Sequence, residues 1–241
     1  MAGSWYEIKH KKNKADAKRG ATFTKLAQAI TLAVRQGGGD PAMNAALETV
    51  LRKAKAANMT NDIIDRAIKK GKGENAGDAE LVELVYEGYA PLGVPILVLA
   101  LTDNPNRTVA HVRHIFSKHG GKYADSGSVS FQFQRKGLLQ VRLSGNTEDS
   151  ELALMESGLE DYSFLEENLV ESICAPADLS AVSKRLSEAG LTVEEAKLGY
   201  VPLSPTRIDN DADMETLAQF FSLMEDSDDI QQIYSTIPLN A

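Results

Sequence analysis

One apolar run in the chain, Val94–Leu101, is hydrophobic at both alternating sets of positions and contains several β-branched residues. A strand buried on both faces produces this pattern. Thr102–Asn104 end the run, and apolar residues at helical spacing follow within Val109–Phe116. With further strands predicted at Glu83–Tyr89 and Ser128–Phe133, the order of elements favours a layered α/β domain.

The boundaries of the helix in this domain can be predicted from its flanking residues. Asn106 or Thr108 can cap its beginning, because short polar side chains accept hydrogen bonds from free backbone N–H groups. Gly120 and Gly121 can take the left-handed conformation that ends a helix.

Helical periodicity also dominates the beginning of the chain. A first helix is predicted over Ala15–Val34, and the pair Asp40–Pro41 is typical of a cap and first turn that open a second. Thr60 is expected to cap a third helix, which Gly71 ends. The polar, Gly-rich stretch Lys72–Asp78 is the predicted linker to the α/β part.

A second series of elements follows Gln134. Periodicity predicts strands at Leu138–Leu143, Asp161–Leu165, Leu169–Cys174 and Thr192–Tyr200. It also predicts a helix from Thr147 or Asp149 to Leu159 and another from Leu179 to Leu186. The order βαββαβ is that of the ferredoxin-like fold. A terminal helix and strand are too short to form their own core, so they are expected to return to the first sheet.

These patterns together predict an α+β protein. An N-terminal three-helix module is followed by two α/β domains, the second a ferredoxin-like βαββαβ unit inserted into the first. The predicted domains are residues 1–75, residues 76–134 with 206–241, and residues 135–205.

The net charge of −8 conceals an uneven distribution. Residues 1–73 contain 15 Lys and Arg against 6 Asp and Glu, a net charge of +9, whereas residues 74–241 contain 11 against 28, a net charge of −17. Such asymmetry indicates a basic module for a polyanion, carried on an acidic body.

Seven of the 15 Lys and Arg in residues 1–73 lie within the first 25 residues, where long cationic side chains suit phosphate oxygens. Phosphate contacts position a protein without selecting a sequence. Base contacts are expected from Asn61 and Arg66 if the second and third helices act as a helix-turn-helix. The candidate phosphate-binding residues are Lys9, Lys11, Lys12, Lys14, Lys18, Arg19 and Lys25.

A second anion contact is predicted on the helix after the apolar strand, at Arg107, Arg113 and Lys118. His111 and His114 lie one turn apart on this helix, but no cysteine joins them, so no metal site is predicted. The acidic residues are expected to form a solvated surface or to dock a basic protein partner. They are Glu166, Glu167, Glu171, Asp226, Asp228 and Asp229.

The single cysteine, Cys174, cannot form an internal disulfide, which favours a reducing cytoplasm. No apolar run is long enough for a membrane helix, so no membrane association is expected. The sequence contains no nucleophile motif and no convincing carboxylate pair. We therefore predict no enzymatic activity and no cofactor; a metal-assisted hydrolase would rest on the histidines alone.

Several motifs, taken in order, resemble the YebC family of transcriptional regulators. They are WYEIKHKKNKADAKRGATFTKL, GGGDP, KAKAANMTNDIIDRAIKKGKGE, YEGYAPLGVPILV, LTDNPNRTVAHVRHIFSKHGGKYADSGSVSFQF and RKG. The resemblance covers nearly the whole chain and is densest from Trp5 to Gly137. One departure is at the start, where the family usually reads MAGHSKW and this chain runs from Ser4 into Trp5 without that His and Lys.

The resemblance implies a three-domain fold, a cytoplasmic location and DNA binding. It also adds His10 to the basic contact residues, within the IKHKK motif. Related members act in translation, in mitochondria and on bacterial ribosomes. The expected function is therefore a DNA-binding transcriptional regulator, with a ribosome-associated translation factor that binds RNA as the alternative.

Overall fold

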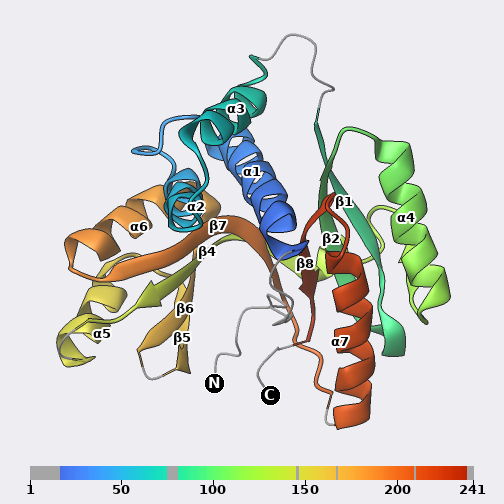
Figure 1. Cartoon of the computed structure of the whole chain (residues 1–241). Helices are drawn as coiled ribbons and strands as arrows, with labels where there is room; N and C mark the ends of the chain where they lie inside the picture. The colour runs from blue at the N-terminus through green and yellow to red at the C-terminus, as the bar shows by residue number, and fades with distance from the viewer. Residues whose placement is uncertain (1–16, 75–80, 145–146, 167, 209, 238–241) are drawn as a thin grey trace. The chain divides into compact units, whose positions relative to one another are not determined.

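The computed structural model describes residues 17–74, 81–144, 147–166, 168–208 and 210–237 (Figure 1). They form two compact units, each with its own hydrophobic core. The first unit joins residues 29–74 to Arg135–Tyr200, and the second combines the start of the first helix with residues 81–134 and 201–237.

Three helices open the described chain: α1 (Ala17–Gly37), α2 (Ala45–Ala56) and α3 (Asn61–Lys72). α3 packs closely on the second half of α1. Thr31 Oγ1 donates to the carbonyl of Ala67 at 3.1 Å. A Cβ added to Gly71 would lie 2.7 Å from Val34 Cβ, so only glycine allows this approach. α3 continues through Gly71, contrary to the prediction, and ends at Lys72, with Gly73 (φ 73°) as its C-cap.

The beginning of α2 also differs from the prediction. Asp40 Oδ1 accepts from Ala42 N in a local turn, and the helix begins four residues later than Pro41, at Ala45. Asn44 is the true cap, since its Oδ1 accepts from Leu47 N at 3.1 Å. Its Nδ2 also donates to the carbonyl of Ala33, so a tertiary contact selects the cap.

The sheet of the second unit has the strand order β3-β1-β2-β8, with every neighbouring pair antiparallel. All eight residues of β2 are buried, as its apolar pattern predicts. α4 and α7 pack against one face of this sheet. The element bounds are β1 (Val82–Tyr89), η1 (Pro91–Gly93), β2 (Pro95–Thr102), α4 (Pro105–Lys118), β3 (Lys122–Ala124), α7 (Asp211–Glu225) and β8 (Ile230–Ser235).

Pairing of β8 with β2 confirms that the terminal strand returns to this sheet.

The cap of α4 is neither Asn106 nor Thr108. Asn104 Oδ1 accepts from Arg107 N at 3.1 Å, and Pro105 occupies the first turn. Thr108 is instead buried, where its Oγ1 lies 2.8 Å from Asp229 Oδ2.

The strand predicted at Ser128–Phe133 is wrong. Ser130–Gln132 form a 3-10 turn, η2, and the strand beside β1 is β3, which the sequence pattern did not reveal. The backbone N–H groups of Val129 and Ser130 donate to the carboxylate of Glu87. Because a side chain takes these donors, this segment cannot pair as a strand.

The sheet of the first unit has the order β5-β6-β4-β7, and β6 is antiparallel to both β5 and β4. Each βαβ half is thus split by a strand of the other half, which confirms the ferredoxin-like prediction. The bounds are β4 (Phe133–Arg142), α5 (Thr147–Glu156), β5 (Asp161–Glu166), β6 (Leu169–Cys174), η3 (Pro176–Asp178), α6 (Leu179–Glu188) and β7 (Thr192–Pro202).

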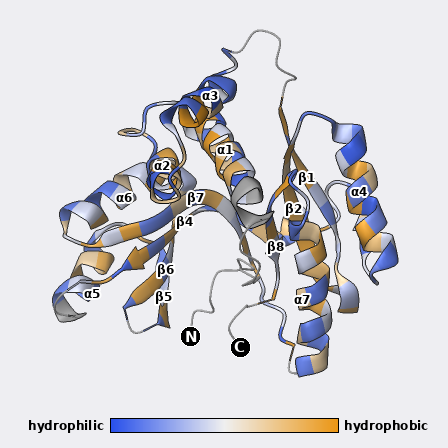
Figure 2. Ribbon diagram, viewed as in Figure 1, coloured by the Kyte–Doolittle hydropathy of each residue, from blue (hydrophilic) through white to orange (hydrophobic). Residues whose placement is uncertain are grey.

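Hydrophobic residues concentrate on the strands of both sheets (Figure 2). The core of the first unit combines Leu139, Val141 and Val170 of the sheet with Val182 and Leu186 of α6. By alternation, the neighbouring residues of β4 and β6 face the opposite side of this sheet. The fold is therefore α+β, with the helical segment preceding both sheets in the chain.

Candidate nucleic-acid interface

The predicted phosphate-binding residues lie mostly at or before the beginning of α1. Lys18 and Arg19 fall in its first two turns. The remaining N-terminal candidates lie outside the described residues: Lys9, His10, Lys11, Lys12 and Lys14.

Lys25 lies on α1 in the second unit and is half-buried. Its Nζ donates to the carbonyl of Glu225 at 2.5 Å. Glu225 is the last residue of α7, where unpaired carbonyls and the helix dipole favour a cation. Lys25 therefore has an intramolecular partner of its own.

The end of α3 presents cations that the sequence analysis did not include among the contact residues. Lys69 and Lys72 are exposed and Lys70 is half-buried in its last turn. Within the described residues, Lys69 and Lys70 have no carboxylate within 4.0 Å, whereas Lys72 Nζ lies 3.9 Å from Glu74. The KKGK run is visible in the sequence. Cations also stabilise the end of a helix through its dipole, so the run by itself does not indicate a ligand.

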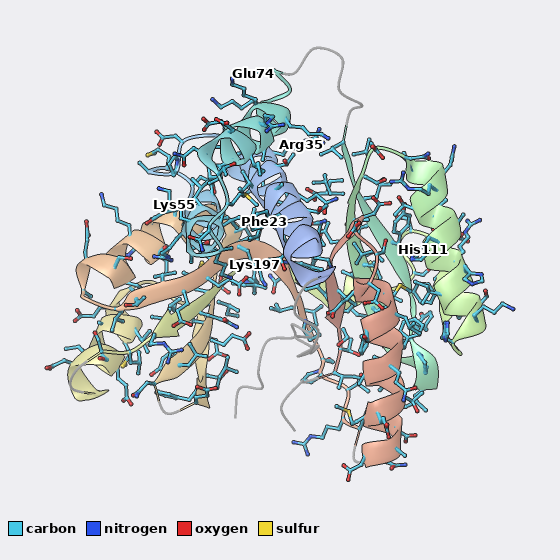
Figure 3. All side chains as sticks on the ribbon, viewed as in Figure 1. Phe23, Arg35, Lys55, Glu74, His111 and Lys197 are labelled. Carbon is cyan, nitrogen blue, oxygen red and sulfur yellow. The ribbon has the colours of Figure 1, made fainter. Side chains whose placement is uncertain are left out.

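α2 uses two of its cations to hold the ferredoxin-like sheet. Arg52 donates to the carbonyl of Val193, and Lys53 Nζ lies 3.0 Å from Glu195 Oε1. Lys55 differs, because it is exposed and has no described carboxylate within 4.0 Å (Figure 3). The cations of α2 therefore divide into Arg52 and Lys53, which contact the sheet, and Lys55, which does not pair with a described carboxylate.

The connection between α2 and α3 is short, as in a helix-turn-helix. Asn58 takes a left-handed conformation, with φ 61°, to make the turn. Asn61 and Arg66 are both exposed at the start of α3, and Arg66 Nε donates to the carbonyl of Asp62. Base reading by Asn61 and Arg66 remains a prediction. The carboxylates of Asp62 and Asp65 are exposed on the same part of the helix.

The three residues predicted to make a second anion contact have different surroundings on α4. Arg107 Nη2 lies 3.0 Å from Asp229 Oδ2 and 3.1 Å from Asp103 Oδ1. Hydrogen bonding to Asp229, more than to Asp103, raises the pKa of Arg107. Arg113 lies over the Tyr123 ring at 4.6 Å, and Lys118 is exposed in the last turn. The structure therefore pairs Arg107 with carboxylates and leaves Lys118 in solvent.

The histidines of this segment, His111, His114 and His119, are all exposed. Among the described residues there is no group of three or more His, Cys, Asp or Glu side chains that could hold a metal ion. The described helices also include none that is both long and apolar enough to cross a membrane.

The predicted acidic surface contains two residues with internal roles. Glu171 is only 7% exposed, and Asp229 binds Arg107 and Thr108.

Cys174 is fully buried in the core of the first unit, and burial raises the pKa of its thiol to about 12. A thiol in this state has little thiolate at neutral pH and is a poor nucleophile.

Glu87 is a buried carboxylate that sequence reasoning missed. It is 4% exposed and accepts from the backbone N–H groups of Gly127, Val129 and Ser130 at 2.7, 2.7 and 2.9 Å. Burial by itself would raise the pKa of Glu87, but these hydrogen bonds outweigh it and the pKa is lowered. Glu87 therefore fixes the loop between β3 and β4 as an ionised group.

Comparison with known proteins gives consistent matches along the chain. Residues 3–74 match the family model described as the TACO1/YebC protein N-terminal domain, and residues 81–237 match that of the TACO1/YebC second and third domain.

Relatives named probable transcriptional regulatory protein include one from Persephonella marina, 43% identical over 100% of this chain and 97% of its own length. Another, from Corynebacterium efficiens, is 44% identical over 100% of this chain and 96% of its own. The crystal structure of a conserved hypothetical protein from Aquifex aeolicus superposes with a TM-score of 0.83 at 40% identity, covering 97% of this chain and 96% of that one. With both family models matched and this identity sustained over the full length, the chain belongs to the TACO1/YebC family.

Proposed function

We propose that this protein is a non-enzymatic, DNA-binding regulator of transcription that holds the phosphate backbone through its basic N-terminal helical segment. The names of its relatives support a regulatory role. The observation that carries the proposal is the charge separation, +9 over residues 1–73 against −17 over the remainder. A polyanion is attracted by the first part and repelled by the second, which orients it on the protein.

The described cations of α2 and α3 support a contact with phosphate. Lys55, Lys69 and Lys70 have no described carboxylate within 4.0 Å, so a phosphate need not displace one. Each cation that neutralises a phosphate of duplex DNA releases about 0.9 counterion. At 0.1 M salt, one such contact therefore corresponds to roughly eightfold in affinity.

The ferredoxin-like sheet is a less suitable platform for bases. RNA-recognition domains of related topology stack bases on aromatic side chains across the open face of the sheet. Here the side of β4 and β6 opposite the helices carries Leu138, Gln140, Glu171 and Ile173, and three of these four are buried. A buried carboxylate and aliphatic residues offer neither stacking nor positive charge.

The test compares the wild-type chain with the Lys11→Glu, Lys14→Glu double variant in binding to a mixed-sequence DNA duplex. We expect loss of measurable affinity with an almost unchanged melting temperature, because lysines that hold a phosphate of the ligand contribute little to the stability of the free protein. Unchanged affinity would refute the proposal, and so would a large loss of stability, which would show these lysines to be structural.

Because DNA and RNA share the phosphate group, the same cations would serve a ribosome-associated translation factor. Sucrose-gradient fractionation of a cell lysate separates the two functions. Sustained co-migration with ribosomes would assign the protein to translation, whereas sharp sequence preference in duplex binding would support transcription.

A further inference from the structure

The segment Pro105–Lys122, which contains α4 and the first residue of β3, is a basic island within the acidic part of the chain. Residues 74–241 contain 11 Lys and Arg, and four of them lie here. Three of the four histidines lie here as well, and the segment contains no Asp or Glu. The basic residues are Arg107, His111, Arg113, His114, Lys118, His119 and Lys122.

The packing of α4 places much of this charge on its solvent side. Val112, Ile115 and Phe116 are buried against the sheet. Arg107, His111, His114 and Lys118 follow at spacings of three and four residues, and all are exposed. Residues at this spacing share one side of a helix, so they form a stripe that runs the length of α4. Figure 3 labels one of them, His111.

Arg113 lies beside this stripe and is held in place although it is exposed. Its guanidinium lies 4.6 Å from the centroid of the Tyr123 ring, and Tyr123 packs edge-on against the buried Phe116 at 6.0 Å. Stacking uses the face of the guanidinium and leaves its N–H donors directed outward. An arginine held in this way loses little conformational entropy when it binds a phosphate.

The charge of the stripe is not neutralised along its length. In the part of the chain that the structure describes, only Arg107, at the beginning of α4, has carboxylate partners, Asp103 and Asp229. Within the described residues, Lys118 and Lys122 have no carboxylate within 4.0 Å. The unneutralised charge therefore lies toward the end of α4, where the helix dipole also stabilises cations.

The length of the stripe suits a nucleic-acid strand. With a rise of 1.5 Å per residue, the distance along the axis from Arg107 to Lys118 is about 16 Å. One strand of duplex DNA has a phosphate about every 3.4 Å along its axis, so the stripe is about as long as five phosphates.

We infer that the solvent side of α4, with Arg113 and Lys122, is a second phosphate-binding surface for the nucleic acid bound by the N-terminal segment. The inference rests on the proposed function and extends it, because it adds a contact from the second unit. The ligand recognised is the phosphodiester backbone, and Lys118, Lys122 and Arg113 carry the interaction.

The test uses the full-length Lys118→Gln, Lys122→Gln double variant, with the mixed-sequence DNA duplex and purified ribosomal RNA as probes. Two lost phosphate contacts at 0.1 M salt predict roughly sixty-fold weaker duplex binding and a salt slope smaller in magnitude by about 1.8. The matched control is Arg142→Gln with Lys184→Gln, which removes the same charge from exposed residues paired with Glu194 and Glu188. The control should bind as the wild type does.

A parallel measurement on the Lys11→Glu, Lys14→Glu variant separates failure of this inference from failure of the proposed function. If that variant loses affinity while the Lys118, Lys122 variant retains wild-type affinity and salt slope, the second surface is refuted and the function stands. If both variants bind as the wild type does, both proposals fail.

A second variant guards against an indirect effect on folding. Arg113→Lys keeps the charge and removes the planar group that stacks on Tyr123. We expect severalfold weaker binding and an unchanged melting temperature. Ultraviolet crosslinking should also map wild-type contacts to residues 105–122; crosslinks confined to the N-terminal segment would contradict the inference.

Discussion

The end of α3 and the ferredoxin-like domain place their Lys and Arg side chains in different surroundings. In the ferredoxin-like domain, Lys136 pairs with Glu160 and Arg142 with Glu194. At the end of α3, Lys69 and Lys70 have no described carboxylate within 4.0 Å. The difference follows from composition, because residues 74–241 have an excess of acids and residues 1–73 lack one.

This comparison shows how charge can be assigned to structure or to binding. A cation beside a carboxylate must lose that partner before it binds an anion, whereas an unpaired one pays no such cost. Glu87 is the extreme structural case, since it is buried and accepts from the backbone N–H groups of Gly127, Val129 and Ser130. Substitutions at structural charges should therefore reduce stability, and those at unpaired cations should reduce affinity.

The largest expected effect is that of Glu87→Ala. It leaves three buried or half-buried N–H groups without an acceptor, which should lower the free energy of unfolding by about 4 kcal/mol. The melting temperature should fall by about 10 °C. Glu83→Ala, at an exposed position on the same strand, is the matched control and should change stability little. Thermal melts that show equal stability for the two variants would contradict the assigned role of Glu87.

The lowered pKa of Glu87 predicts how stability depends on pH. A carboxylate with a lower pKa in the folded state stabilises fully above its unfolded pKa of about 4.3. This contribution is lost as the pH falls through the folded-state pKa. Glu87→Gln should therefore be less stable than the wild type at neutral pH, and urea denaturation should show the difference narrowing below about pH 4.

The next effect is on affinity. Lys69→Gln with Lys70→Gln should weaken duplex binding by roughly sixty-fold at 0.1 M salt if both lysines contact phosphate. The same Arg142→Gln, Lys184→Gln variant used for α4 supplies the control, since its cations are paired. Fluorescence anisotropy titrations would measure both. Equal losses in the two variants would mean that net charge alone, and not the unpaired position, governs binding.

The smallest effect is expected for the pair of Lys53 and Glu195, which joins α2 to β7. Lys53 is partly exposed, so a double-mutant cycle with alanine should give a coupling free energy of about 0.5 kcal/mol. Nucleic-acid affinity should not change in the Lys53→Ala variant. A substantial loss of affinity would move Lys53 from the structural to the binding group.

The sequence predicted the order of the main elements because their hydrophobic periods are strong. The fully apolar pattern of β2 and the βαββαβ series needed no tertiary information. The return of the terminal strand followed from its length, since so short a segment cannot bury a core of its own. The uneven charge distribution is likewise a property of the sequence alone.

Helix ends and caps depended on contacts that are distant in the sequence. Asn44 caps α2 partly because its amide also binds Ala33, and Gly71 lies inside α3, where Val34 leaves no room for a Cβ. Local propensity favoured Pro41 and Gly71 as helix boundaries. Propensity considers only neighbouring residues and includes neither of these contacts, so both predicted boundaries were wrong.

The partners of the charged residues were also decided by the tertiary structure. Arg107, Arg113 and Lys118 look alike in the sequence, yet one pairs with carboxylates, one stacks on an aromatic ring and one meets solvent. Charge composition is additive and can be counted along the chain, so the sequence alone determined where cations and anions concentrate. Pairing depends on distances of a few ångströms between residues far apart in the chain, such as Arg107 and Asp229, and only folding sets those distances.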